Sequence, residues 1–229
     1  MIYVSSNGGV SWTQSLNLQD GRRIEMAVSP AQPTWVYAVV SGIDDGLYGV
    51  YKSTNSGASF IQIFSGTTSN LLGWLSNGSG TGGQGWYDLS LAVSPTNANT
   101  IILGRVLTWK SINGGSSWVY SNGAHVDKHM HKYTSGGQLF ECNDGGIYMS
   151  ADNGATWIDK SSNLSIAQMY KLGVSQRSSG EVLTGLQDNG TQSLNNGSWD
   201  YANGGDGMEC IIDYNDANVQ YSSTQSGNI

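Results

Sequence analysis

Charged side chains are scarce in this sequence, and the few that occur are mostly acidic. Only 12% of the 229 residues are charged, which is about half the usual share for a globular domain. The formal net charge is −7, with 10 lysines and arginines in all. Nucleic acids and anionic membranes both need a basic surface on their partner, so we expect neither to bind this chain.

Proline, cysteine and long apolar runs are also scarce. Cys142 and Cys210 lie in different repeats and are expected to be free thiols, although sequence alone leaves a disulfide open. No apolar run reaches the length of a transmembrane helix, so we expect no membrane insertion. The opening stretch MIYVSSNGGVSW predicts a strand and a turn rather than a signal peptide, which fits a mature form or a fragment.

Glycine and large aromatic residues are plentiful instead. The 32 glycines suit tight turns between short strands, and the 8 tryptophans and 12 tyrosines can supply large buried areas. This composition predicts an all-β domain with a sizeable core and without long helices.

One motif recurs along the chain: Ser, any residue, Asn or Asp, any residue, Gly, any residue, Ser or Thr, and an aromatic residue. It occurs as SSNGGVSW from Ser5, STNSGASF from Ser53, SINGGSSW from Ser111 and SADNGATW from Ser150. A fifth copy, SLNNGSW from Ser193, is one residue short. Most intervals are close to the roughly 40–50 residues of one propeller blade, and one is longer.

The chemistry of the motif predicts a hairpin turn. Its Asn or Asp can accept hydrogen bonds from backbone N–H groups of the turn, and its glycine can adopt a backbone angle closed to most residues. The closing aromatic is expected to anchor the hairpin in the sheet. The structural positions are therefore Asn7, Gly9, Trp12, Asn55, Gly57, Phe60, Asn113, Gly115, Trp118, Asp152, Gly154 and Trp157.

Strand-like segments surround each copy and predict four-stranded antiparallel blades. We predict one β-propeller domain over residues 1–229, with blades at 22–64, 86–121, 124–160 and 165–201. Residues 207–229 and 1–16 read as the two halves of a fifth blade. Either these halves pair and close a five-bladed ring, or the chain is a run from a larger propeller.

The motif copies, the VSP strands and the stretch NDGGIYMSADNGATW resemble the Asp-box (bacterial neuraminidase repeat) β-propellers. The chain is similar to xyloglucanase-type glycoside hydrolases, sortilin-like propellers and secreted bacterial relatives with a His-x-Asp-x-His strand and a Gln-Asp-Asn-Gly turn. The resemblance covers the whole chain and implies an extracellular or cell-surface location. Those relatives are larger, which slightly favours the run from a larger propeller.

The resemblance alone does not identify an activity, because Asp boxes lie at blade peripheries. Sialidases of this class use an arginine triad within a Phe/Tyr-Arg-Ile-Pro pattern, and none of Arg22, Arg23, Arg105 and Arg177 lies in that pattern. We therefore exclude a sialidase. The xyloglucanase-type enzymes imply two aspartates in a cleft between two propellers, and neither matches a motif in this chain.

The stretch GAHVDKHMHKY holds all three histidines of the protein. His125, Asp127, His129 and His131 alternate, so we expect them on one face of a strand that lines the central channel. Two imidazoles and a carboxylate can bind a divalent transition metal, which makes His125, Asp127 and His129 a candidate metal site. A polar strand without metal and a histidine base are the alternatives, and no cofactor is required.

Carboxylates and aromatic rings near the blade ends suggest carbohydrate chemistry. Glycoside hydrolysis needs two carboxyl groups, about 5–5.5 Å apart for retention or about 6.5–9.5 Å apart for inversion. The catalytic candidates are Asp127, Asp144, Asp188 and Asp206. Asp144 and Asp188 also fit turn caps. The substrate-binding candidates are Trp74, Trp86, Tyr87, Tyr170 and Glu209.

Two hypotheses follow. The first is a secreted carbohydrate-active propeller of glycoside-hydrolase type, with a polysaccharide as substrate. The second is a non-catalytic module that binds a glycan or a protein, or serves in surface assembly. The glycine-rich insert SGTTSNLLGWLSNGSGTGGQGWYD bears on both, since long loops in compact domains are often functional. Its Trp86 can stack on a sugar or pack between blades.

Overall fold

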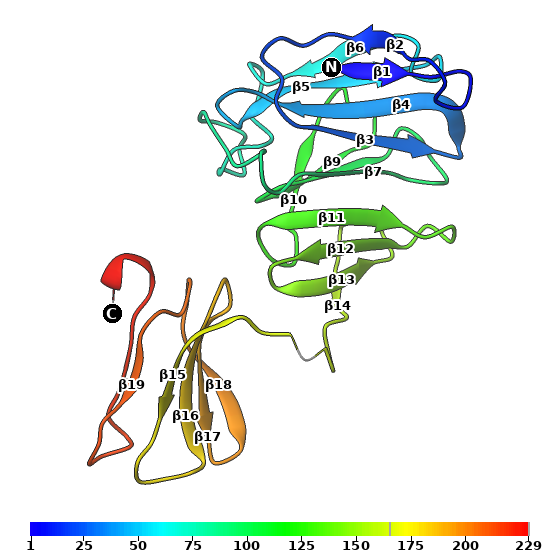
Figure 1. The fold of residues 1–229 in the computed structure, drawn as a ribbon. Helices are drawn as coiled ribbons and strands as arrows, with labels where there is room; N and C mark the ends of the chain where they lie inside the picture. Colours follow the sequence, from blue (N-terminus) through cyan, green and yellow to red (C-terminus); the bar gives the residue numbers. More distant parts are fainter. Residues whose placement is uncertain (165, 229) are drawn as a thin grey trace. The chain divides into compact units, whose positions relative to one another are not determined.

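The computed structural model describes residues 1–164 and 166–228, and these residues are almost entirely strands and turns. The chain divides into two compact units, Met1–Ser162 (unit 1) and Asn163–Ile229 (unit 2), each of which is described by itself (Figure 1). Within the described residues, no helix has the length and hydrophobicity needed to cross a bilayer.

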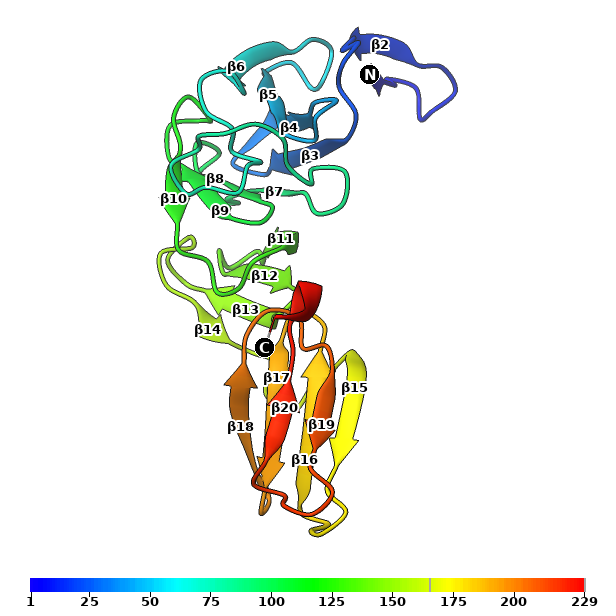
Figure 2. The same cartoon turned by 90° about the vertical axis from the view of Figure 1, so that its left-hand side faces the viewer.

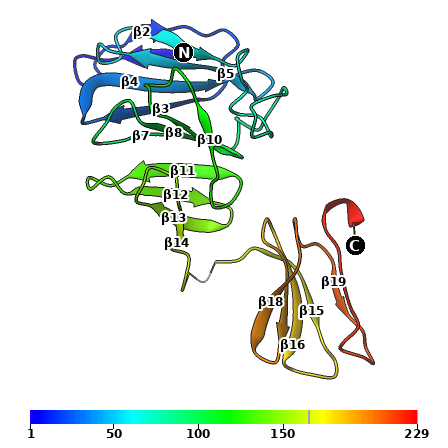
Figure 3. The same ribbon diagram turned by 180° about the vertical axis from the view of Figure 1, so that it is seen from behind.

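Unit 1 contains three four-stranded antiparallel sheets, each a meander of consecutive strands. Their strands are β3 (Ile24–Ser29), β4 (Gln32–Ser41), β5 (Leu47–Ser53) and β6 (Ile61–Ser65); β7 (Ser90–Val93), β8 (Ile101–Gly104), β9 (Thr108–Ser111) and β10 (Val119–Ser121); and β11 (Lys128–Tyr133), β12 (Leu139–Asn143), β13 (Gly146–Ser150) and β14 (Ile158–Asp159). The first strands β3, β7 and β11 neighbour one another in that order (Figure 3). A two-stranded sheet, β1 (Ile2–Val4) with β2 (Thr13–Leu16), precedes them.

Unit 2 contains one further four-stranded antiparallel sheet, formed by β15 (Met169–Val174), β16 (Glu181–Leu186), β17 (Gly190–Asn195) and β18 (Ser198–Asn203). The two-stranded sheet of β19 (Cys210–Ile212) and β20 (Gln220–Ser222) follows, and β19 contacts β15 and β16 (Figure 2). A short 3-10 turn, η1 (Gln225–Gly227), comes last.

The all-β fold class and the four-stranded antiparallel sheets are thus confirmed. The closed five-bladed ring and the run from a larger propeller both stay predictions, because β1–β2 and β19–β20 are separate two-stranded sheets. Ser165 and Ile229, each the end of a predicted blade range, lie outside the described residues. Cys142 and Cys210 are free thiols.

The largest core of unit 1 lies between the β3–β6 sheet and the β7–β10 sheet. Val39 and Ile101 from the two sheets are fully buried in it, and Leu72 of the glycine-rich insert packs into the same cluster. Full burial of such a side chain stabilises the fold by about 1.5–3 kcal/mol. The insert is therefore anchored to the core rather than free in solvent.

The four full-length motif copies fold into one hairpin geometry, seen between β9 and β10. Ser111 Oγ donates to Asn113 Oδ1 (3.0 Å), which also accepts the backbone N–H of Ser117 (3.0 Å). The backbone N–H of Gly115 donates to Ser111 Oγ (2.9 Å), and Gly115 has a φ of 88°. Matching bonds form in the copies from Ser5, Ser53 and Ser150.

The fifth copy folds differently. Asn196 and Gly197 form a two-residue turn between β17 and β18, and their φ values are 49° and 87°. Two consecutive positive φ angles are the signature of a tight hairpin turn that matches the twist of the strands. Because this copy is one residue short, it has a two-residue turn in place of the longer motif turn.

Most closing aromatics anchor their hairpins as predicted, and Trp12 does not. Phe60, Trp118 and Trp157 are partly buried against three separate core clusters. Trp12 is 63% exposed, because the two-stranded β1–β2 sheet offers it no third and fourth strand to cover.

We predict that Asn113→Ala lowers the free energy of unfolding by about 1–2 kcal/mol, because the backbone N–H of Ser117 loses its acceptor. Asn113→Asp should retain most of the stability, because Asp152 fills the same position in another copy. Urea denaturation of both variants checks this. Equal losses in both would contradict the role given to the side-chain oxygen.

Candidate functional site

The predicted site residues fall into two groups, one in each unit. Unit 1 contains His125, Asp127, His129, Asp144, Trp74, Trp86 and Tyr87, and unit 2 contains Tyr170, Asp188, Asp206 and Glu209. Most lie in the segment that leads into the first strand of a sheet rather than in the strand itself. For example, Trp86 and Tyr87 precede β7, and Asp127 precedes β11.

The prediction that four alternating residues share one strand face is wrong. β11 begins at Lys128, so His125 and Asp127 precede it, and Asp127 has a φ of 60°. The pairing with β12 shifts register between Lys128 and Met130, which is a β-bulge. The extra residue reverses the alternation, so that His129 is exposed and His131 is buried.

His129 and Asp144 form the exposed part of the site. His129 Nε2 lies 2.7 Å from Asp144 Oδ1. Asp144 is in the two-residue turn between β12 and β13, and its carboxylate contacts His129 at the bulge of β11. The ring of Tyr87 meets the His129 imidazole edge to face at 5.3 Å between centroids. The pair therefore has an aromatic wall on one side.

Asp127 is half-buried beside this pair. Gln84 Nε2 donates to Asp127 Oδ1 (2.8 Å), which fixes the carboxyl group to the glycine-rich insert. Burial raises the pKa of Asp127, and the negative charge of Asp144 raises it further, while Lys128 and Arg105 oppose both effects. Asp127 thus keeps its proton to a higher pH than an ordinary aspartic acid, which suits a proton donor.

Asp88 and Arg105 lie buried beneath the site, and sequence reasoning missed the role of Arg105. Both side chains are fully buried, with Arg105 Nε 3.9 Å from Asp88 Oδ1. Burial raises the pKa of Asp88 to about 6 against the opposing charge of Arg105. The guanidinium also lies 4.5 Å from the centre of the Trp74 ring. The sequence feature that indicates this buried charge is the position of Arg105 directly after the apolar strand IILG.

The aromatic candidates of unit 1 expose broad ring surfaces. Trp74, Trp86 and Tyr87 are 53%, 61% and 52% exposed. Arg23 donates hydrogen bonds to the backbone carbonyls of Trp86 and Tyr87, which holds this segment in place. In unit 1, Trp86 is thus available for stacking rather than packed between sheets.

A Ser–His–Glu chain lies next to the site, but its burial makes it structural. Ser90 Oγ is 2.8 Å from His131 Nδ1, and His131 Nε2 is 2.8 Å from Glu141 Oε2. Thr108 Oγ1 also donates to Glu141 (2.9 Å). None of Ser90, His131 and Glu141 is more than 6% exposed, so no substrate can reach the serine hydroxyl.

The group in unit 2 is smaller. The backbone N–H of Asp188 donates to Asp206 Oδ1 (2.7 Å), so Asp206 caps the turn at Asp188. Lys171 Nζ pairs with Glu209 Oε2 at 3.5 Å. Tyr170, Lys171 and Glu209 line an open cavity of about 490 Å³.

The metal prediction gains no support from this geometry. Among the described residues, no group of three or more His, Cys, Asp or Glu side chains could hold a metal ion. His125, Asp127 and His129 are therefore not brought together as a set of ligands, and His129 Nε2 instead pairs with the carboxylate of Asp144.

No model of a known protein family matches the chain, and no curated protein matches it. Among solved structures it is similar to an ancestral GH74 enzyme (16% identity, TM-score 0.49, covering 98% of this chain and 32% of that one). It is also similar to the GH74 xyloglucanase from Xanthomonas campestris (16%, TM-score 0.42, 87% and 34%) and to YCF48 bound to D1 peptide (14%, TM-score 0.41, 87% and 62%). The chain spans about a third of the length of the two GH74 structures.

We predict that Gly104→Ala lowers the free energy of unfolding by about 1–3 kcal/mol, because a Cβ there would overlap the buried His131 ring. Gly136→Ala is the matched control, since its Cβ would meet only the Thr134 hydroxyl at 3.7 Å. Thermal denaturation compares the two. Equal stability of both variants would contradict the tight packing of the Ser90–His131–Glu141 chain.

Proposed function

We propose that this chain belongs to a secreted glycoside-hydrolase-like β-propeller and acts on a polysaccharide through Asp127 and Asp144. One observation carries the proposal: the pKa of a half-buried carboxyl group, Asp127, is raised in part by the charge of a second carboxylate, Asp144, which a histidine orients. Paired carboxyl groups in unequal environments are the arrangement that glycoside hydrolysis uses.

The two carboxyl groups divide the chemistry between them. Asp127 donates its proton to the glycosidic oxygen as the bond to the leaving sugar breaks. Asp144 stabilises the positive charge that develops on the sugar ring, and acts on the anomeric carbon directly or through a water molecule. His129 orients the Asp144 carboxylate, and Gln84 orients Asp127.

The exposed rings beside the carboxyl groups supply binding surface. Trp86 and Tyr87 lie 5.3 Å apart between ring centroids, and Tyr87 also contacts His129. Flat apolar surfaces of this size suit the faces of sugar rings, while their polar rims remain in water. The same surface would serve the second hypothesis, a module that binds a glycan without cleaving it.

We also propose that the sheets are blades of an Asp-box propeller. The motif turn joins the third and fourth strands of each four-stranded sheet in unit 1, and it joins β1 to β2. The β1–β2 sheet is then the outer half of a blade, and β19–β20 fits the inner half. If the two halves pair with each other, they complete one blade and close the ring. If each half is completed by other strands, the chain is a run from a larger propeller.

We predict that Asp127→Asn and Asp144→Asn each reduce turnover of the susceptible polysaccharide by at least about 100-fold. Asp20→Asn is the control, because Asp20 is exposed in unit 1 and lies outside the site. Reducing-end release from a panel of neutral polysaccharides measures the effect. Absence of turnover by the unmodified protein would contradict the hydrolase, and binding without turnover would favour the glycan-binding module.

The pH dependence follows from the direction of the Asp127 pKa shift. A proton donor works only below its pKa, so activity should decline as pH rises through the raised pKa of Asp127. Asp144→Asn removes a negative charge that raises this pKa, so the alkaline limb of any residual activity should move to lower pH. If the alkaline limb of the activity of Asp144→Asn lies at the same pH as that of the unmodified protein, Asp127 is not the proton donor.

A further inference from the structure

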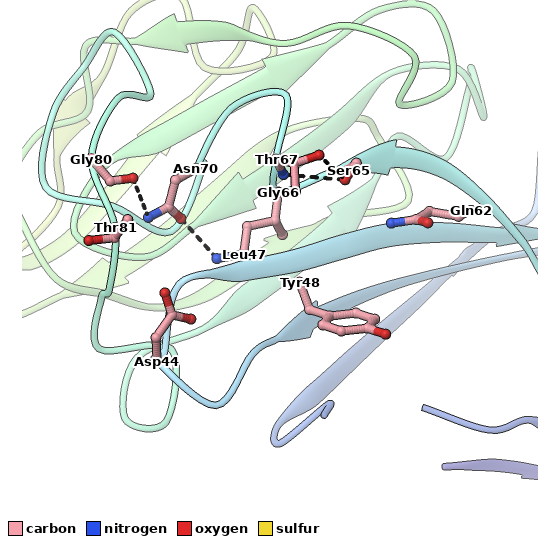
Figure 4. Close-up of a pocket in the computed structure, with 10 residues that line it drawn as sticks. All are labelled: Asp44, Leu47, Tyr48, Gln62, Ser65, Gly66, Thr67, Asn70, Gly80 and Thr81. Atoms are coloured by element: carbon pink, nitrogen blue, oxygen red, sulfur yellow. Dashed lines mark hydrogen bonds between the residues drawn. The ribbon is translucent and has the colours of Figure 1, made fainter. Parts of the chain in front are cut away.

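Besides the cavity in unit 2, a cavity lies in unit 1, where β5, β6 and the glycine-rich insert meet. Its volume is about 470 Å³, within the range of small-ligand sites. Figure 4 shows Asp44, Asn70 and Thr81 on one side of it and Tyr48 and Gln62 on the other. None of these residues belongs to the Asp127–Asp144 site.

The walls of the cavity are held by a dense set of hydrogen bonds. Asn70 is buried, and its Oδ1 accepts the backbone N–H groups of Leu47 (2.8 Å) and Leu72 (3.2 Å). Asn70 Nδ2 donates to the carbonyl of Gly82 (2.8 Å), whose N–H donates to Asp44 Oδ2 (3.1 Å). The insert is thereby tied to the β4–β5 turn, and the cavity is preformed.

Glycine is required at one wall. A Cβ on Gly66 would overlap the backbone carbonyl oxygen of Leu47, so the chain can approach this closely only without a side chain. The close approach brings the end of β6 against the start of β5 beneath the cavity.

The lining identifies the class of ligand. It contains a tyrosine ring, amide and hydroxyl groups and the single carboxylate of Asp44, but no Lys, Arg or His. An anionic ligand would meet no positive charge there. A neutral molecule rich in hydroxyl groups can donate to Asp44 and exchange hydrogen bonds with Gln62 and Thr81, while its apolar face covers the Tyr48 ring.

We propose that this cavity is a second saccharide-binding site, which takes an uncharged sugar unit. Tyr48 packs against the core cluster of Ile2, Leu18 and Tyr51, so its ring is a fixed platform. The inference rests on the proposed function in one respect only, namely that the sugar unit belongs to the polysaccharide substrate. One insert supplies Asn70 and Thr81 to this cavity and Gln84 to the Asp127–Asp144 site.

Calorimetric titration with cellohexaose, xylohexaose and mannohexaose tests the proposal. The titrations use the full chain carrying Asp127→Asn, so that cleavage of the ligand is strongly slowed. At least one neutral oligosaccharide should bind, and Tyr48→Ala and Gln62→Ala should each weaken binding about tenfold or more, equivalent to about 1.4 kcal/mol. Tyr214→Ala, at an exposed tyrosine of unit 2, should leave affinity unchanged.

The outcomes separate the two proposals. Binding that depends on Tyr48 and Gln62 supports the second site, even if the unmodified protein cleaves no polysaccharide. Absence of binding at about 1 mM, or affinity unchanged by Gln62→Ala and Thr81→Val, overturns it, even if Asp127 and Asp144 prove catalytic. Gln62 and Thr81 are exposed, so these two variants keep the test valid if Tyr48→Ala fails to fold. Binding of a hexagalacturonate instead would contradict the uncharged ligand.

Discussion

The guanidinium of Arg105 is fully buried in unit 1, with Asp88 as its ion-pair partner and the Trp74 ring stacked on it. Removing one partner from such a buried pair typically costs about 3–5 kcal/mol, because the remaining charge has lost its compensation. Asp88 leads into β7, Trp74 belongs to the glycine-rich insert, and the backbone of Arg105 accepts the N–H of Lys128 at the start of β11 (2.7 Å). The glycine-rich insert, which contains both Trp74 and Asp88, and the start of β11 are therefore positioned around one charge.

That arrangement accounts for the unequal carboxyl groups above it. Asp127 is half-buried and close to the Asp144 charge, so its ionised form is disfavoured and its pKa rises. Asp144 is in a surface turn, where His129 reaches it directly. The β-bulge in β11 places the two histidines in different environments, because it turns His129 outward to Asp144 and His131 inward to Glu141. A single extra residue thus separates an accessible histidine from a structural one.

Local chemistry made the sheets and motif turns predictable from sequence. Asn113 accepts the same backbone N–H and Gly115 has the same positive φ as the matching residues of the other full-length copies. The bulge at His129 was not predictable, because alternation of residue types says nothing of where a register shift falls. Nor was the pairing of Asp88 with Arg105, which joins residues from different segments through tertiary packing. Asp127 was identified because it alternates with the histidines of GAHVDKHMHKY, and Asp144 because it precedes a glycine at a strand end. Their unequal environments depend on the fold and could not be predicted from sequence.

Asp127 holds its proton more tightly than an ordinary aspartic acid because of burial and the neighbouring Asp144 charge. Carboxyl-carbon NMR titration of the unmodified chain and of Asp144→Asn measures this directly. We expect a pKa for Asp127 above the ordinary value of about 3.9, and a lower one in Asp144→Asn. A pKa at or below the ordinary value, or one that does not respond to Asp144→Asn, would contradict the account.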